Sequence, residues 1–244
     1  MQYTLLATTV CLAFAAATAT QAATIRPTAP AAAAKRAHFG AEQPSRDTRR
    51  VANAVVASGD NEGGHFIILD KVHARVYVFD PHGTLRASAP ALLGLARGDD
   101  TVPGIGDKKI ADIKPEERTT PAGRFVAEMG QSSSRGEDVV WVDYDSAVSM
   151  HRVVTSNPKE RRLQRLATRS PKDNRISYGC INLPKAFYEK WVGGIVSKRR
   201  TIVYVLPEVW NPRQVFPFLN GMTRAAYRHE AGPPSQGSMP IIGQ

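Results

Sequence analysis

The sequence contains two cysteines, and their surroundings differ sharply. Cys11 lies in an apolar N-terminal stretch, whereas Cys180 follows Gly179 in the run Arg-Ile-Ser-Tyr-Gly-Cys-Ile-Asn-Leu-Pro. A glycine beside a thiol lets a substrate carbonyl approach closely, and a sharp turn there can point consecutive backbone N–H groups at one spot. Acyl transfer to a cysteine requires such a site. The simpler alternative is a small buried hydrophobic residue, the common fate of a free cysteine.

His151 is the candidate base for this thiol. A thiol needs a neighbouring base to become a good nucleophile near neutral pH. His151 ends a short segment that follows the apolar run 139–142, so we expect it at the end of a rigid strand. The other five of the six histidines fall in segments predicted as tether, hairpin, turn or tail, and no Cys/His pair has metal-ligand spacing. The sequence therefore predicts a Cys180–His151 pair and no metal.

The first 23 residues have the composition of a secretory signal peptide. Residues 5–17 are apolar or small and uncharged, and small residues follow up to Ala23. The apolar stretch is shorter than the roughly 20 residues that span a bilayer. Cleavage near Ala22 or Ala23 would leave an exported chain with one thiol and no possible internal disulfide. The alternative is a buried or interfacial N-terminal helix.

The formal net charge of +10 arises entirely after Ala23. Export makes nucleic acid an improbable partner, which leaves anionic envelope polymers or acidic substrates for this charge. A solvated basic surface without any partner is the plain alternative.

The elements that must position the pair follow from composition and periodicity. Residues 24–64, rich in Ala, Pro and Arg, predict a flexible tether with one short helix over 47–58, capped by Asp47. A folded domain is predicted over 65–207 and a tail with little regular structure over 208–244. Strands are predicted at 66–69, 72–79, 85–93, 123–128, 139–144 and 201–206, the second of them half-buried.

Turns, loops and helices complete this outline. Residues 80–83 form a turn in which His82 is a turn residue. Residues 94–119 are predicted to be a surface loop. One helix follows Asn182, with Phe187, Trp191 and Ile195 facing the core and an end soon after the glycine pair 193–194. The domain is thus expected to be mainly β with one or two helices.

Two motifs resemble a known family. Ser177-x-Gly179-Cys180-Ile181-Asn182, preceded by a strand that ends in His151, looks like the catalytic signature of L,D-transpeptidases, the YkuD-type domain. Residues 120–123, Thr-Pro-Ala-Gly, resemble that family's Thr-Pro-x-Gly turn, and the likeness runs from about residue 65 to 206. It implies a mixed β-sandwich-like fold, a periplasmic or cell-envelope location, and no membrane span once the signal is removed.

The resemblance also implies a reaction. These enzymes cleave a peptidoglycan stem tetrapeptide after its diamino acid, release D-Ala and hold the acyl group as a thioester, without a cofactor. An amine of a second stem resolves the thioester as a cross-link, and water resolves it as carboxypeptidase activity. Two alternatives remain open, an envelope cysteine amidase or carboxypeptidase and a non-catalytic peptidoglycan-binding protein.

The resemblance assigns supporting roles around the pair, with three departures from the family pattern. Arg152 stands where the family usually has Gly or Ser, Tyr178 replaces the usual His, and 28 residues separate base from nucleophile, more than is usual. Support of the oxyanion and the site falls to Ser177, Tyr178 and Gly179. The candidates for substrate binding are Arg152, Arg175 and Asn182.

The long segment between base and nucleophile is strongly basic, with Lys159, Arg161, Arg162, Arg165 and Arg169. Leu163 and Leu166 predict a short helix, with Asn157 as its cap and Pro171 as its end. Both ends of the segment are anchored at the site, and Arg binds carboxylates bidentately. We therefore predict a basic lid that selects acidic stems, with Arg175 nearest the thiol. The alternative is a solvated insertion.

Overall fold

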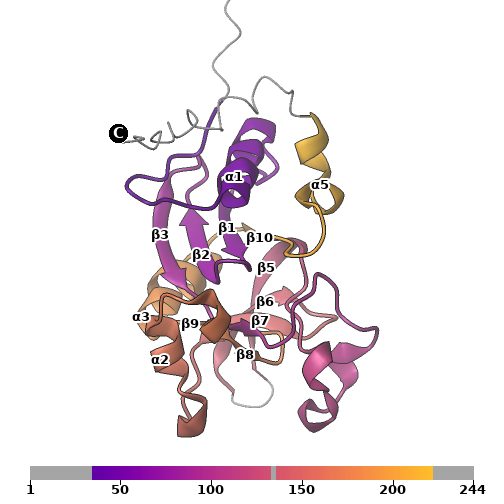
Figure 1. Ribbon diagram of the computed structural model, residues 1–244. Coiled ribbons are helices and arrows are strands. Elements are labelled where there is room, and N and C mark those ends of the chain that lie inside the picture. The colour runs from indigo at the N-terminus through magenta and orange to yellow at the C-terminus, as the bar shows by residue number, and fades with distance from the viewer. Residues whose placement is uncertain (1–34, 133–135, 222–244) are drawn as a thin grey trace, which may run out of the picture. The chain divides into compact units, whose positions relative to one another are not determined.

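The computed structural model describes residues 35–132 and 136–221, in which strands dominate and helices are few and short (Figure 1). The predicted signal peptide and residues 222–244 of the predicted tail lie outside the described residues. The mainly β class predicted from the sequence is confirmed. The strands are β1 (His65–Asp70), β2 (Arg75–Phe79), β3 (Leu85–Pro90), β4 (Leu93–Gly94), β5 (Gly123–Gln131), β6 (Asp138–Asp143), β7 (Val148–Arg152), β8 (Arg175–Ser177), β9 (Ile181–Leu183) and β10 (Thr201–Val205).

Eight of these strands form one mixed sheet in the order β3-β2-β1-β10-β5-β6-β7-β9. The pairs β1–β10 and β7–β9 are parallel, and the other neighbours are antiparallel. β5 belongs to both halves of the sheet, because residues 123–127 pair with β10 and residues 128–131 with β6. The short strands β4 and β8 pair separately, and a bridge between Leu92 and Asn182 ties this segment to β9. Cys180 and His151, the predicted nucleophile and base, thus lie at the β7–β9 end of the sheet.

Both faces of the sheet are covered, so the central strands carry apolar residues on both sides. Ile67 and Leu69 of β1 pack into one core, whereas Phe66 and Ile68 pack into another on the opposite face. The period-two alternation predicted for residues 72–79 is present only over β2, because Val72 lies in an exposed turn. That strand is not half-buried as predicted, since its second face is covered as well.

The second core is covered by α1 (Arg46–Ser58), which begins at its cap Ser45 rather than at Asp47. Val51 and Val55 are fully buried on the sheet, as the helical spacing predicts. His38 forms a bridge to Thr84. The predicted tether is therefore wrong for residues 35–64. The low apolar content of this segment is concentrated in one stripe, which suffices to dock it on the sheet.

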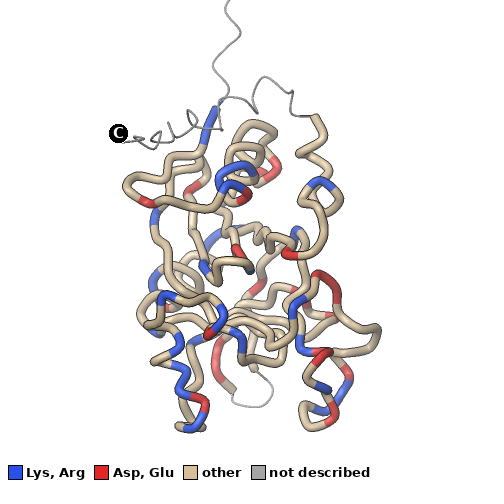
Figure 2. The backbone as a smooth tube through the Cα atoms, viewed as in Figure 1, with Lys and Arg blue, Asp and Glu red and all other residues tan. Residues whose placement is uncertain are grey.

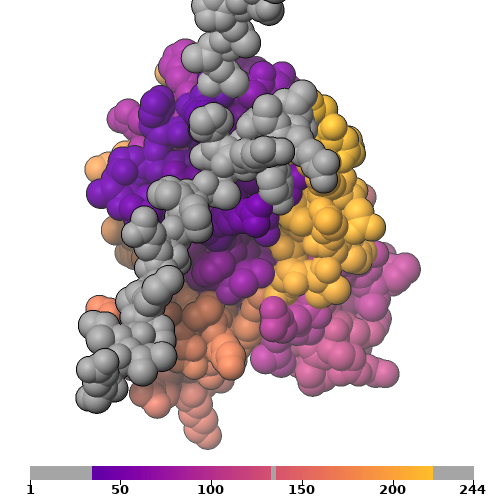
Figure 3. All heavy atoms as spheres, turned by 45° about the horizontal axis from the view of Figure 1, so that its top comes forward, coloured from indigo at the N-terminus to yellow at the C-terminus, as the bar shows by residue number. Residues whose placement is uncertain are grey.

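The predicted tail is wrong for residues 208–221. These residues form α5 (Pro212–Val215) and η7 (Pro217–Gly221), and Phe216 and Leu219 are fully buried in the core that α1 covers. In the space-filling view the yellow C-terminal segment and the indigo N-terminal segment lie against each other (Figure 3).

The helix predicted after Asn182 is present as three consecutive pieces, α3 (Lys185–Phe187), the π-helical η6 (Tyr188–Gly193) and α4 (Gly194–Val196). Its fully buried side chains are Tyr188 and Val192, one position beyond the predicted stripe. Phe187, Trp191 and Ile195 pack only at the margin of that core. Both sets recur every four residues, so spacing alone does not select between them, and the wide π turn places the second set inward.

The remaining helical elements are short. Residues 94–119 contain η1 (Ile105–Asp107), η2 (Ile110–Asp112) and η3 (Pro115–Glu117), in agreement with the predicted loop. Residues 158–174 contain η4 (Pro158–Glu160), α2 (Arg162–Ala167) and η5 (Pro171–Asn174). Asn157 caps η4 and not, as predicted, the helix that carries Leu163 and Leu166, which begins after Arg161 and ends before Pro171. Within the described residues, no helix has the length and apolar character needed to cross a membrane.

Candidate active site

The parallel pairing of β7 with β9 brings His151 and Cys180 onto one face. Met150 lies opposite Ile181 in this pairing, and both are fully buried in the core. His151 lies opposite Asn182. Because successive side chains of a strand alternate between faces, His151 and the residue before β9, Cys180, lie on the face away from that core. Two residues that are far apart in the sequence are thus held by neighbouring strands.

His151 and Cys180 line the same cavity, which has a volume of about 280 Å³. Ser149 and Tyr178 belong to its polar wall. The opposite wall comes from the segment predicted to be only a surface loop, which contributes Ile105, Gly106, Lys108, Ile110 and Ile113. No local pattern of residues predicts this wall, because it is formed by segments that are far apart in the chain.

The Cys180 thiol is half-buried and has two polar neighbours. Its Sγ lies 3.5 Å from the carbonyl oxygen of Ala147, to which it can donate, and 3.7 Å from Ser149 Oγ. The thiol is therefore within reach of the cavity, while its position is fixed by the end of β7. A small buried hydrophobic residue, the alternative interpretation, would not be expected among such polar groups.

The His151 ring is only 5% exposed, and one of its nitrogens has a defined role. Nδ1 lies 2.7 Å from the backbone oxygen of Arg152, and a carbonyl oxygen can only accept a hydrogen bond. Nδ1 therefore carries the hydrogen in the neutral ring, and the lone pair resides on Nε2. This tautomer, held by the backbone of the adjacent residue, is the one that lets Nε2 take a proton.

The loop before Cys180 is folded back on itself by Ser177. Ser177 Oγ accepts from the Gly179 N–H at 3.1 Å and donates to the Cys180 carbonyl at 2.6 Å. Gly179 has a φ of +132°, and a Cβ there would lie 2.8 Å from the Thr119 carbonyl oxygen. Only glycine fits this position. The turn leads directly into strand β9 and not into a helix, which starts only at Lys185.

Tyr178 forms part of the cavity wall and is 37% exposed. The guanidinium of Arg118 lies over its ring, 3.9 Å from the centroid, and is held there by two bonds to the Ile113 carbonyl. The sequence analysis did not identify Arg118, because nothing local distinguishes it from the other arginines. A cation therefore lies beside the cavity on the 94–119 loop.

The three residues predicted to bind substrate bind other protein groups and do not line the cavity. Arg152 pairs with Asp138 and Glu189. Arg175 donates to Glu208 at 2.6 Å and to the Lys71 carbonyl at 2.9 Å. Asn182 is almost fully buried and donates to the Cys180 carbonyl at 3.3 Å. Their positions assign them to holding the strands and loops around the site.

The basic segment 158–174, predicted to cover the site as a lid, does not line the cavity. Arg162 donates to Asn182 at 2.6 Å, and Arg165 donates to two backbone carbonyls within its own segment. Leu166 is buried and lines a separate hollow with residues 73–75 of the β1–β2 hairpin, which is where the segment is anchored. Lys and Arg residues are frequent along it, as Figure 2 shows. Among its described residues, none of 158–174 lines the cavity.

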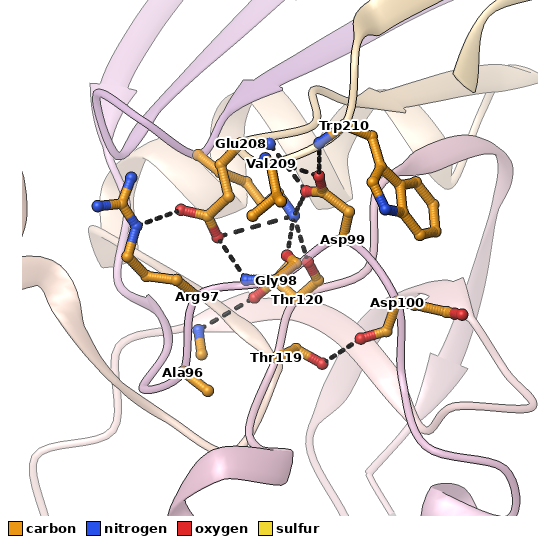
Figure 4. A network of polar contacts seen from close by, with 12 residues as sticks. Ala96, Arg97, Gly98, Asp99, Asp100, Thr119, Thr120, Glu208, Val209 and Trp210 are labelled. Atoms are coloured by element: carbon orange, nitrogen blue, oxygen red, sulfur yellow. Dashed lines mark hydrogen bonds and ion pairs between the residues drawn. The ribbon is translucent and has the colours of Figure 1, made fainter. Parts of the chain in front are cut away.

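A buried ionic network joins residues 98–99, 120 and 208–210, and sequence analysis did not identify it (Figure 4). Lys71 is 0% exposed and donates to Gly98 O at 2.5 Å, to Asp99 Oδ1 at 2.7 Å and to Thr120 O at 2.8 Å. These three acceptors match the three donors of an ammonium group, so we assign Lys71 as charged. Glu208 joins the network through Arg97 and Arg175.

Asp99 connects this network to the C-terminal segment. Its carboxylate accepts the backbone N–H groups of residues 208, 209 and 210 at 2.6–2.8 Å. Burial by itself would raise the pKa of Asp99, but the Lys71 ammonium and these three N–H groups outweigh it and hold the pKa below its usual value.

Comparison with known proteins identifies similarity at the level of structure. No protein-family model matches the sequence, and no curated protein matches it. The helical cell shape determining protein of Campylobacter jejuni is 17% identical, with 62% of this chain and 51% of that chain covered and a TM-score of 0.38. An L,D-transpeptidase of Stackebrandtia nassauensis is 14% identical, with 64% and 65% covered and a TM-score of 0.38.

A further L,D-transpeptidase, solved in complex with imipenem, is 18% identical, with 59% of each chain covered and a TM-score of 0.33. The chain spans between about half and two thirds of the length of these solved proteins.

Proposed function

We propose that the protein is a cysteine acyl transferase of the L,D-transpeptidase type that acts on peptidoglycan stem peptides in the cell envelope. The observation that carries the proposal is the shared cavity of Cys180 and His151 on neighbouring parallel strands, with Nδ1 of His151 bound to a carbonyl. The Ser-x-Gly-Cys-Ile-Asn motif, which resembles the family's signature, supports it as well. The predicted signal peptide would direct the chain across the inner membrane.

In the first half of the reaction, Nε2 of His151 takes the proton from the Cys180 thiol, and the thiolate attacks the carbonyl of the stem's diamino acid. The carbonyl oxygen becomes an oxyanion. The Gly179 N–H already donates to Ser177, so the Cys180 N–H is the donor that we assign to this oxyanion. His151 then returns the proton to the amine of the departing D-Ala, and a thioester on Cys180 remains.

In the second half, an amine of another stem attacks the thioester and gives up a proton to His151. The C–S bond breaks, the amide cross-link forms, and the proton returns to the Cys180 sulfur. Water in place of the amine gives a carboxypeptidase product by the same steps.

We assign the recognition of stem carboxylates to the 94–119 loop. Lys108 lines the cavity, and Arg118 is stacked on Tyr178 at its wall. An arginine held over an aromatic ring keeps its planar donor edge in a fixed orientation, which suits a carboxylate. The apolar side chains Ile105, Ile110 and Ile113 would contact the aliphatic parts of the stem.

Mass spectrometry with imipenem tests the nucleophile. Imipenem belongs to the carbapenems, β-lactams that acylate L,D-transpeptidases. The mature protein should gain the mass of one imipenem, and Cys180→Ala should gain none. A wild-type protein without an adduct, or an adduct that persists in Cys180→Ala, contradicts the mechanism and favours the non-catalytic peptidoglycan-binding protein.

Purified muropeptides with and without an added amine acceptor test the reaction. Cross-linked or amine-exchanged products establish a transpeptidase, and release of D-Ala with water as the sole acceptor establishes the cysteine carboxypeptidase instead. Cleavage of a different bond would identify an amidase.

A further inference from the structure

We infer that Thr120, whose backbone carbonyl is held by Lys71, is a positioning residue for Cys180, and that its hydroxyl sets the direction of the Cys180 backbone N–H. The inference rests on the proposed function, in which that N–H stabilises the oxyanion. It concerns a residue that touches neither the thiol nor the cavity wall among the described contacts.

Thr120 makes three hydrogen bonds and is almost fully buried. Its Oγ1 donates to the Gly179 carbonyl at 2.7 Å and accepts from the Gly94 N–H at 3.0 Å. Its backbone carbonyl accepts from Lys71 Nζ at 2.8 Å. One residue therefore links the nucleophile loop, the β4 segment and the buried ammonium.

The bond to Gly179 has a geometric consequence for the next residue. The peptide bond between Gly179 and Cys180 is trans, and in a trans peptide the carbonyl oxygen and the following N–H lie in one plane and point in opposite directions. When Thr120 holds the Gly179 oxygen, the Cys180 N–H is directed away from Thr120. The whole peptide unit would have to rotate for that N–H to point elsewhere, and such a rotation would break the 2.7 Å bond.

Two further contacts prevent Thr120 and Gly179 from moving together. The Thr119 carbonyl packs against the Cα side of Gly179 so closely that no Cβ fits. On the opposite side, Lys71 ties the Thr120 carbonyl to Gly98 and Asp99, as the dashed lines around Thr120 and Gly98 in Figure 4 indicate. The ammonium thus serves as a fixed reference point for the loop, because a buried charge keeps its partners close.

A positioning role and a merely structural role differ in which reaction of the thiol they affect. Acylation by imipenem passes through a tetrahedral oxyanion, which needs the Cys180 N–H. Alkylation by iodoacetamide displaces iodide at a saturated carbon and forms no oxyanion, although it needs the same accessible thiolate. The ratio of the two rates therefore reports the orientation of the N–H and not the general integrity of the site.

The test measures both rates at one pH in wild type, Thr120→Val, Thr120→Ser and Thr119→Val. Thr120→Val keeps the shape but removes the hydroxyl, and should slow imipenem acylation roughly ten- to hundred-fold, less than the 10²–10³-fold expected when an oxyanion donor is lost altogether. Its alkylation rate should stay near that of wild type. Thr120→Ser should restore acylation, because it retains Oγ1.

Thr119→Val is the matched control. The Thr119 hydroxyl also donates to a backbone carbonyl, that of Asp100 at 2.6 Å, but this carbonyl is not part of the nucleophile loop. Its loss should leave the ratio of the two rates unchanged.

The inference is overturned if Thr120→Val is acylated as fast as wild type, or if its acylation and alkylation fall by the same factor. Failure of the proposed function looks different, because imipenem would then not acylate even the wild-type protein, and the inference would fall with it.

Discussion

Replacement of Lys71 by methionine should lower the free energy of unfolding strongly, because Lys71 is the donor in a buried network of polar groups. Methionine keeps most of the length and apolar stem of the side chain but removes the ammonium. Three acceptors then lose their donor, namely the Gly98 carbonyl, the Asp99 carboxylate and the Thr120 carbonyl. The side chains of Lys71, Asp99 and Glu208 have no exposed surface, so water does not replace the lost partner.

The magnitude follows from the remaining contacts. Removing one partner of a buried ion pair costs about 3–5 kcal/mol in free energy of unfolding. Asp99 keeps its three backbone N–H donors and Glu208 keeps Arg175, so the carboxylates stay partly compensated and the loss should not exceed this range. A domain of this kind has a stability of about 5–15 kcal/mol, of which the expected loss is a large part.

Urea unfolding, followed by tryptophan fluorescence and far-ultraviolet circular dichroism, measures this difference. Lys185→Met is the control, because Lys185 is exposed at the start of α3 and methionine has a similar helix propensity. The control should lie within about 0.5 kcal/mol of wild type. A loss of less than about 1 kcal/mol for Lys71→Met would refute the reasoning, since such a value is typical of an exposed charge.

Three other variants test the site and its surroundings. His151→Ala should lower the acylation rate about 10²–10⁴-fold, and the rate should recover partly in alkali, where the thiol ionises without the histidine. Stopped-flow measurement of imipenem acylation at several pH values checks this. A wild-type rate at neutral pH would mean that another group is the base. Tyr178→Phe should lower the acylation rate less than about tenfold, well below the 10²–10⁴-fold that a general acid–base group contributes, because the ring still stacks on Arg118. A loss as large as that of Cys180→Ala would show that the phenol takes part in the reaction. The pKa of Asp99 is lower in the folded state than in the unfolded state, so its contribution to stability is present above the unfolded-state pKa and is lost as the pH falls through the folded-state value. The stability difference between wild type and Asp99→Asn, from urea unfolding, should therefore be constant near neutral pH and shrink below about pH 4, and a difference that shrinks instead as the pH rises would contradict this assignment.

The features that sequence analysis predicted depend on local patterns. Runs rich in apolar residues located β1, β5, β6 and β10 within three residues at each end, since the sheet packs against a core on both faces. The sequence marked Cys180 and His151 through residue type and neighbours, and the structure places both at one cavity. Their chemical roles remain a proposal.

The features that it missed depend on residues far apart in the chain. Lys71 and Asp99 are 28 positions apart, and Asp99 bonds to residues 109–111 positions further on. Charged residues are most often exposed, so no local pattern distinguishes those that the fold buries. For the same reason the sequence predicts a lid at the basic segment 158–174 and only a surface loop at 94–119, whereas residues of the 94–119 loop line the cavity. Composition does not reveal which loop lies over the cavity.

The place of β10 in the sheet has a consequence for how the chain matures. β10 is the last strand among the described residues, yet it lies between β1 and β5 in the middle of the sheet. A chain that emerges from a ribosome or a translocon N-terminus first would lack the strand that pairs with both β1 and β5 until residue 205 is available. Such long-range pairing slows folding. The thiol would therefore be synthesised before the sheet that holds it is complete, and the proposed activity would arise only after β10 has paired with β1 and β5.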